Sequence, residues 1–215
     1  MTVKRSPRWT RRPADRPDEI LDAAQSVFIQ CGYGSASMGE IARRAGVSPG
    51  LLYRYFRGKE ALFLALVRRL AERVTGELRR QLGAQGAGPA ADWPTRLTAL
   101  AARMYEHISH PRTMGLFQLA LGEGHRLPEL SRIFYREVVQ RVEEIFTAQI
   151  SQAMREGALR HIDPVVAHRA FAGMMLICAM ERRIFRSRRR HLRAETLIPQ
   201  LIGVYLSGLL VERQR

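Results

Sequence analysis

Residues 35–63, SASMGEIARRAGVSPGLLYRYFRGKEALF, constrain the fold more than any other stretch of the chain. Ser37 can cap a short helix, and Glu40 stands three residues later, where it can complete a capping box. Gly46 suits a sharp turn, because a positive φ carries no steric cost for glycine. Ser48, followed by a proline, can then begin a second helix. A small residue, a glycine four residues on and an aliphatic residue ten residues on predict a DNA-reading helix-turn-helix.

The segment GEIARRAGVSPGLLYRYFRGKEAL resembles the DNA-binding signature of the tetracycline-repressor (TetR) family of bacterial regulators. The resemblance runs from about Asp18 to Leu66, with the turn, Leu-Tyr-x-Tyr-Phe and Lys-Glu-x-Leu at the family's spacing. A later segment, LALGEGHRLPELSRIFYREVV, is similar to a subgroup that carries a Glu-x-x-Arg-x-Pro-Glu-Leu stretch. Membership of this family implies a homodimer.

Helical periodicity, with no alternating strand pattern, predicts an all-α fold of about nine helices. An N-terminal three-helix helix-turn-helix domain is expected, followed by a C-terminal helical domain for ligand binding and dimerisation. The predicted helices outside the motif cover about 18–31, 59–82, 93–110, 112–122, 128–157, 164–186 and 195–212. The predicted domains are a basic flexible arm at 1–17, the DNA-binding domain at 18–60 and the effector-binding and dimerisation domain at 61–215.

The net charge of +15 is concentrated in two short runs of arginine. Residues 1–17 carry +5 and residues 182–193 carry +7, whereas residues 18–60 are neutral. The arm can enter a minor groove or act as a tail that adds non-specific affinity for DNA. The second run is expected to be a solvated loop, with an anionic ligand or partner as the alternative.

The second motif helix is short, so few of its side chains can reach DNA. Arg54 is the only one able to make a bidentate contact to a guanine, with a phosphate contact or a solvated charge as alternatives. Tyr53 and Tyr55 are predicted phosphate donors, unless one of them is buried in the core. The predicted DNA-binding residues are Ser37, Ser48, Pro49, Gly50, Leu51, Tyr53, Arg54, Tyr55 and Lys59.

Lys59 stands out because the chain has 33 arginines and only two lysines. A cation at the start of a helix opposes the helix dipole at a cost of about 0.3–1 kcal/mol. A phosphate would be attracted by both the ammonium group and the helix N-terminus. We therefore expect a phosphate contact, with an incidental surface lysine as the alternative.

The last predicted helix is apolar nearly all round, which is typical of a helix buried on every side. Two helices from each chain would form a four-helix interface around a two-fold axis. The alternative is a central helix of a monomer. The predicted dimer contacts are Leu201, Ile202, Tyr205, Leu206 and Leu209.

An effector pocket is expected in the C-terminal domain, because several methionines there suit an adaptable apolar cavity. The alternative is that these side chains form an ordinary core. His107 and His125 could supply polar anchors. The predicted pocket residues are Met104, Tyr105, His107, Phe117, Leu121, His125, Phe171, Met174, Met175 and Cys178.

Signatures of other classes of protein are not found in the sequence. His107 and His110 lie three residues apart, but no third metal ligand is evident, so neither a metal nor a cofactor is predicted. No catalytic constellation is found, so the chain is not expected to be an enzyme. The most apolar stretch, AFAGMMLICAM, is too short to span a membrane. Two cysteines far apart in sequence favour a reduced cytoplasm.

These features together predict a homodimeric repressor that binds a pseudo-palindromic, double-stranded DNA operator. A small-molecule effector would release the DNA by shifting the population of conformations. The alternatives in the same class are a regulator without a ligand and an activator. An adaptor whose motif domain docks a protein, with no DNA target, is the alternative from another class.

Overall fold

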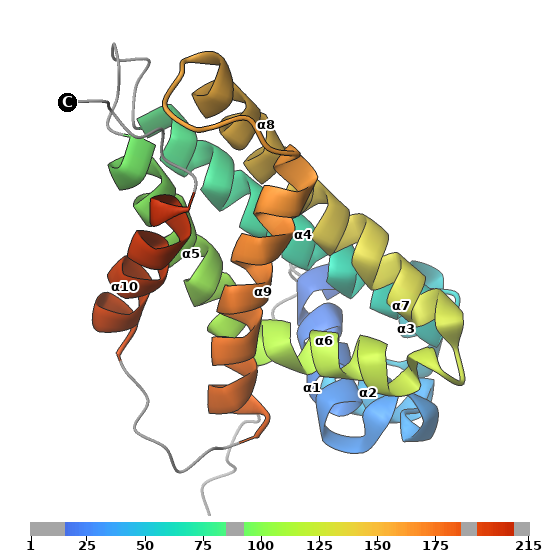
Figure 1. Ribbon diagram of the computed structural model, residues 1–215. Coiled ribbons are helices and arrows are strands. Elements are labelled where there is room, and N and C mark those ends of the chain that lie inside the picture. The colour runs from blue at the N-terminus through green and yellow to red at the C-terminus, as the bar shows by residue number, and fades with distance from the viewer. Residues whose placement is uncertain (1–15, 85–92, 186–192, 209–215) are drawn as a thin grey trace, which may run out of the picture. The chain divides into compact units, whose positions relative to one another are not determined.

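The computed structural model describes residues 16–84, 93–185 and 193–208, and every regular element in these ranges is a helix (Figure 1). They form two compact units that meet between Leu66 and Val67. If contiguous elements are counted together, the described residues form nine helices, so the all-α prediction is confirmed. The arm at 1–15, most of the arginine run at 182–193 and the end of the chain lie outside the described residues.

The N-terminal unit consists of three helices and the first turns of a fourth. The bounds are Arg16–Ser35 for α1, Met38–Arg44 for α2, Pro49–Tyr55 for α3 and Lys59–Ala84 for α4. Phe28, Leu52 and Phe63, from three of these helices, are fully buried. Helix α1 is interrupted at Gly32, whose φ of 79° explains why glycine ends the regular part of that helix.

Side-chain caps fix both helices of the motif. The Ser37 hydroxyl accepts a hydrogen bond from the Glu40 amide (3.1 Å), and the Ser48 hydroxyl accepts one from the Leu51 amide (3.2 Å). Gly46 has a φ of 65°, as the tight turn requires. The Glu40 carboxylate instead binds the guanidinium group of Arg43 at 2.7 and 2.8 Å, so the capping box is formed only in part. An exposed pair three residues apart on one helix face can form this contact without bending the chain.

The C-terminal unit is a bundle in which α5 packs against α6, α9 and α10, and α8 packs against α9. Apart from the rest of α4, its elements are α5 (Trp93–Ser109), α6 (Pro111–Gly124), α7 (Pro128–Phe134), η1 (Tyr135–Gln140), α8 (Arg141–Arg155), α9 (Pro164–Arg183) and α10 (Ala194–Ser207). Two prolines at helix starts, Pro111 and Pro164, agree with the predicted boundaries.

The helix predicted over 128–157 is continuous, but it contains one π-helical segment, η1, between α7 and α8. The turn between α6 and α7 brings the two helices close together. A side chain at Gly124 would collide there with the Ser131 hydroxyl. That hydroxyl donates a hydrogen bond to the Ala120 carbonyl at 2.6 Å. Glycine at 124 therefore lets α7 fold back against the end of α6.

The last helix, α10, was expected to be buried on every side, with a partner subunit as part of its cover. In the structure, one face is covered by the chain's own α5. Ile202 and Leu206 are buried within the chain itself, where α10 packs on α5. The Tyr205 hydroxyl donates a hydrogen bond to the Ala167 carbonyl at 2.9 Å, and burial raises its pKa to about 12. Leu201 is only half-buried, and Leu209 lies outside the described residues.

Helix α9 is longer than the apolar stretch seen in the sequence. Among the described helices it alone is long and apolar enough, by length and composition, to cross a membrane. It carries Arg169 within it and ends at Arg182 and Arg183. Only 28% of its most apolar window is buried in the chain, so much of its apolar surface is uncovered.

Candidate nucleic-acid interface and ligand cavity

The predicted reading face lies on the outside of the N-terminal unit. Ser37, Ser48, Pro49 and Gly50 are exposed, and Leu51 is half-buried. A side chain at Gly50 would meet no neighbour, so the open space there permits a close approach by another molecule. The beginning of α3 is therefore free to contact base edges in a major groove.

The aromatic and cationic residues of α3 divide between surface and edge. The side chains of Tyr53 (53% exposed) and Arg54 are exposed, whereas Tyr55 is half-buried. The guanidinium carbon of Arg54 lies 5.8 Å from the centre of the Tyr55 ring. This contact leaves the donor groups of the guanidinium available for a bidentate contact.

Lys59 has partners within the unit that its sequence position does not reveal. Its ammonium group donates hydrogen bonds to the carbonyls of Tyr33 (2.8 Å) and Gly34 (3.0 Å) and lies 4.9 Å from the centre of the Tyr33 ring. The cation thus lies against carbonyls that follow Gly32, where the regular part of α1 ends. Lys59 therefore stands at the start of α4, as the sequence predicts, but it also makes favourable contacts with the end of α1, and the phosphate contact itself stays a prediction.

Other exposed bases lie on the same unit but were not among the predicted contacts. Arg43 is held by Glu40, and Arg44 donates a hydrogen bond to the Gln30 amide oxygen at 2.6 Å. Arg57 is exposed in the link between α3 and α4. Only the folded structure distinguishes the paired bases, Arg43 and Arg44, from the exposed Arg57, because the sequence does not show which bases have partners.

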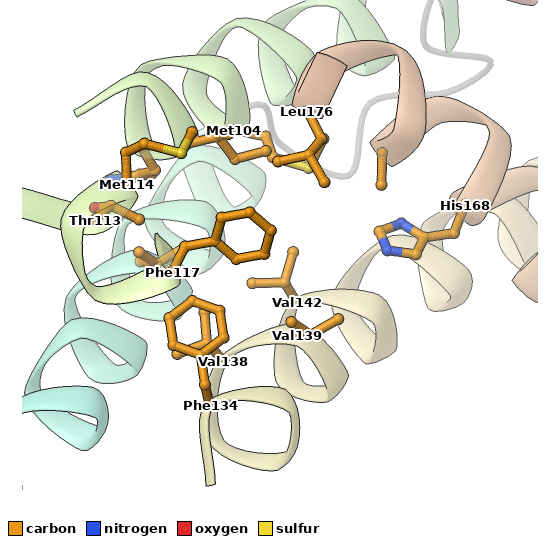
Figure 2. Close-up of a pocket in the computed structure, with 14 residues that line it drawn as sticks. Met104, Thr113, Met114, Phe117, Phe134, Val138, Val139, Val142, His168 and Leu176 are labelled. Carbon is orange, nitrogen blue, oxygen red and sulfur yellow. The ribbon is translucent and has the colours of Figure 1, made fainter. Parts of the chain in front are cut away.

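A cavity of about 160 Å³ lies inside the C-terminal unit (Figure 2). Its wall is almost wholly apolar and contains no lysine, arginine, aspartate or glutamate. The lining residues come from α4, α5, α6, α7, η1, α8 and α9: Val74, Met104, His107, Ile108, Thr113, Met114, Phe117, Phe134, Val138, Val139, Val142, His168, Ala172 and Leu176.

Three polar side chains interrupt this apolar wall. The Oγ1 atom of Thr113 and the Nδ1 atom of His168 are buried and have no hydrogen-bond partner. The Nε2 atom of His107 lies 3.0 Å from a Glu77 carboxylate oxygen, but the geometry does not make a hydrogen bond. A buried polar atom without a partner costs about 1–3 kcal/mol, so these atoms need an explanation.

The histidines at the cavity are biased towards the neutral form. Burial lowers the pKa of His168, which Glu143 opposes and Arg169 reinforces. Burial also lowers the pKa of His107, against the opposing effect of Glu77. A neutral imidazole has one donor and one acceptor nitrogen, so either hydrogen-bonding role is open to it.

The cavity contains only part of the predicted pocket. Met104, His107 and Phe117 line it. Phe171 and Met175 are buried elsewhere, with Phe171 against the rings of Phe146 and Tyr205. Of the remaining predictions, none lines the cavity: Tyr105 is buried, Met174 and Cys178 are half-buried, and Leu121 and His125 are exposed. The structure does not bring these seven residues to this cavity, because apolar composition does not indicate which face of a helix meets free space; their contact with an effector stays a prediction.

Thr113 and His168 were missed by the sequence reasoning. Thr113 stands in the first turn of α6 and His168 in the second turn of α9, and neither position forms a motif. What distinguishes them is burial without a partner, which depends on the packing of separate helices.

The buried carboxylate of Glu137, in the π-helical segment beside the cavity, forms ion pairs with three arginines. Glu137 lies 2.8 Å from Arg141, 3.3 Å from Arg136 and 3.5 Å from Arg68. Burial acts to raise the pKa of Glu137, but Arg68, Arg141 and Arg136 outweigh it and the pKa lies below its usual value. The two residues that follow Glu137 line the cavity, so this cluster holds one part of the cavity wall against α4.

An exposed reading helix in one unit and an apolar cavity in the other define a DNA-binding transcriptional regulator. The model of bacterial regulatory proteins of the tetR family matches residues 20–66, and that of the AefR-like transcriptional repressor C-terminal domain matches residues 95–198. The chain belongs to the TetR family. Proteins of this family are regulators and not enzymes.

Individual relatives agree with this assignment. The transcriptional activator FasR of Mycolicibacterium smegmatis is 36% identical over 104 residues, which cover 48% of this chain and 45% of FasR. The match thus spans less than half of that relative. A solved structure of a protein described as a TetR-family regulator from Mesorhizobium loti is 25% identical, with a TM-score of 0.77, and covers 94% of this chain and 100% of its own.

A third similarity concerns the fold alone. The regulator FadR from Bacillus subtilis, solved in complex with stearoyl-CoA, is 18% identical, with a TM-score of 0.71. The similarity covers 89% of this chain and 98% of FadR.

Proposed function

We propose that the protein is a ligand-responsive repressor that binds a pseudo-palindromic operator as a homodimer and is released by a small molecule. The observation that supports this most is the cavity, whose buried Thr113 and His168 lack partners that a bound molecule could supply. A regulator that did not bind a ligand would gain nothing from these unpaired atoms.

On the DNA side, the proposal assigns base readout to Arg54 and to the exposed start of α3. Ser37, Tyr53, Tyr55 and Lys59 would contact phosphates, which position the protein on the duplex. Two such units in one homodimer would read the two halves of an operator. The arm at 1–17 would add phosphate or minor-groove contacts.

The proposed dimer would use the faces of α9 and α10 that the chain itself does not cover. Val166, Gly173 and Ile177 on α9 are exposed, as is Val204 on α10, at 71%. Leu201 and Tyr205 lie half-buried beside this surface, whereas Ile202 and Leu206 would support it from within. Val204→Arg should therefore separate the subunits while leaving each one folded, as sedimentation would show.

Ligand binding would act by shifting the population between conformations with different affinities for DNA. A protein that meets both DNA and small metabolites in this way is expected in the cytoplasm, where its two free cysteines would stay reduced. The ligand is the proposed partner besides DNA, and no resident cofactor is proposed.

An activator is the second candidate, because FasR is named an activator, whereas the matching C-terminal domain is described as that of a repressor. Measuring transcription from a bound promoter with and without the protein separates the two. Repression requires that transcription falls when the protein is added.

The test of the proposal is selection of bound sequences from random duplex DNA by the full chain. We expect an enriched inverted repeat, with affinity that falls steeply with salt. Arg54→Ala should cost about 1–3 kcal/mol on that sequence and relax specificity at one base pair in each half-site. Arg57→Ala, which removes an exposed charge next to α3, is the matched control and should leave the sequence preference unchanged.

Two outcomes would contradict the assignments. Equal weakening on all sequences would make Arg54 a phosphate contact. If no sequence is enriched at any salt concentration, the protein is not a sequence-specific regulator, and the alternative of a motif domain that docks a protein is favoured. A separate deletion tests the arm. Removal of residues 1–16 should flatten the slope of log affinity against log salt concentration by at most about 0.9 for each lost phosphate contact.

A further inference from the structure

The cavity in the C-terminal unit presents hydrogen-bonding atoms at two separated places on an apolar wall. Figure 2 shows Thr113 on one side and His168 on the other, with Phe117 and Val142 between them. Both polar residues are more than nine-tenths buried, with exposed fractions of 8% and 4%. Neither the Thr113 hydroxyl nor Nδ1 of His168 has a partner in the protein.

We infer that the cavity binds an uncharged, compact, mostly apolar molecule with hydrogen-bonding groups at two separated positions, one for Thr113 and one for His168. This inference rests on the proposed function and specifies the class of its ligand. Two anchors on opposite sides would fix both the position and the direction of the molecule. The apolar wall between them would contact its body.

The size of the cavity limits how much of a ligand it can enclose. Its volume is about 160 Å³. An apolar cavity of about 150 Å³ in another protein holds benzene. The enclosed part of the ligand is therefore of the order of one or two rings.

The chemistry of the wall excludes a charged group inside the cavity. No lining residue carries a fixed charge, and an ionised group buried without a partner is strongly disfavoured. Hydroxyl, phenol and carbonyl groups fit, because a threonine hydroxyl and a neutral imidazole can each donate or accept. An acyl chain of a coenzyme A ester would match the apolar wall but would leave the two polar atoms unpaired.

The experiment measures direct binding to the full chain without DNA, by calorimetry with four probes of nearly equal size. The probes are naphthalene, 2-naphthol, 2,6-dihydroxynaphthalene and 2-naphthoate. We expect affinity to rise by about tenfold for each hydroxyl added and to be lowest for the carboxylate.

Variants then assign each hydroxyl to its anchor. Thr113→Val and His168→Phe should each reduce the affinity for 2,6-dihydroxynaphthalene to that for 2-naphthol, while naphthalene binds as before. Phenylalanine at 168 keeps a ring against Phe146, whose centre lies 5.4 Å from that of the imidazole. Thr196→Val, at an exposed position of α10, is the control and should change nothing.

Several results would overturn the inference, and most need only the wild-type chain. Equal affinity for naphthalene and its diol would mean that the polar atoms do not contact the ligand. Preferred binding of 2-naphthoate, or no binding of any probe, would exclude the ligand class. Stearoyl-CoA serves as a fifth probe. If it binds the wild type and both variants with equal affinity while the diol fails to bind, an acyl ligand is favoured instead. Since DNA is not used, such failures leave the operator selection intact, and a failed selection leaves the probe results intact.

Discussion

The two units of the molecule treat their buried polar groups differently. In the N-terminal unit, Ser37 and Ser48 satisfy amides at helix starts, and Lys59 satisfies carbonyls at a helix end. Among the described residues, every buried side-chain polar atom without a partner lies in the C-terminal unit: in Arg96, His107, Ser109, Thr113 and His168. The paired groups fix one geometry of the N-terminal unit, whereas the unpaired groups of the C-terminal unit are those that a ligand would pair under the proposed function.

The largest expected effect is on the free energy of unfolding, because the core of the N-terminal unit is packed more tightly than the wall of the cavity. Leu52→Ala removes a fully buried side chain from the N-terminal unit and should cost about 2–5 kcal/mol of the free energy of unfolding. Leu176→Ala should cost clearly less, because Leu176 already faces free space in the cavity and has fewer contacts to lose. Urea unfolding followed by circular dichroism measures both. Equal losses would mean that the cavity wall is packed as tightly as the reading domain.

Lys59→Gln tests whether the hydrogen bonds from Lys59 to the Tyr33 and Gly34 carbonyls stabilise the N-terminal unit. Loss of two hydrogen bonds from a charged donor should cost about 1–2 kcal/mol, as thermal melts of the full chain would show. Arg57→Gln removes the same charge from a nearby exposed position and should leave the melting temperature unchanged. A Lys59→Gln protein that melts like the wild type but binds operator weakly would restore the purely phosphate-binding role.

Two buried threonines of the C-terminal unit form a matched pair. Thr75 donates a hydrogen bond to the Ala71 carbonyl at 2.8 Å, whereas the Thr113 hydroxyl has no partner. Thr75→Val should cost about 0.5–1.5 kcal/mol, and Thr113→Val in the free protein should be neutral or stabilising by about 0.5 kcal/mol. Chemical denaturation compares the two. A clear loss for Thr113→Val would show that its hydroxyl is already satisfied.

The pH dependence of stability should show the smallest effect. Burial lowers the pKa of His168 from the ordinary 6.5, so the unfolded chain takes up a proton at a pH where the folded chain does not. The free energy of unfolding should therefore fall as the pH drops below about 6.5, down to the folded-state pKa. His107 and His110 act in the same direction, each mainly through burial. His168→Phe should make the fall shallower in melts between about pH 7.5 and pH 5.5; an unchanged slope would contradict this assignment.

The reading domain could be predicted almost entirely because its determinants are local. Ser37, Gly46 and Ser48 act on backbone groups within three or four residues, and the structure confirms these caps and the turn. Helix bounds in the C-terminal unit were predictable for the same reason, since Pro111 and Pro164 begin helices.

Lys59 shows where local reasoning fails. By position it belongs to the start of α4, where its charge is unfavourable. In the folded unit its ammonium group reaches carbonyls 25 and 26 residues earlier in the chain, at the end of α1. Side-chain reach across a tertiary contact thus gives Lys59 favourable partners that its position in the sequence does not show.

The all-α class and the helix-turn-helix with its caps followed from the sequence, because periodicity and capping depend on neighbours along one helix. The packing of separate helices, in contrast, sets which side chains surround the cavity and which stay unpaired. Met104 faces free space and Met175 does not, although both are buried methionines on apolar helices. Ile202 is covered by the chain's own helices, while Val204, two residues on, is left exposed. Such differences depend on how separate helices pack, and no local pattern encodes that packing.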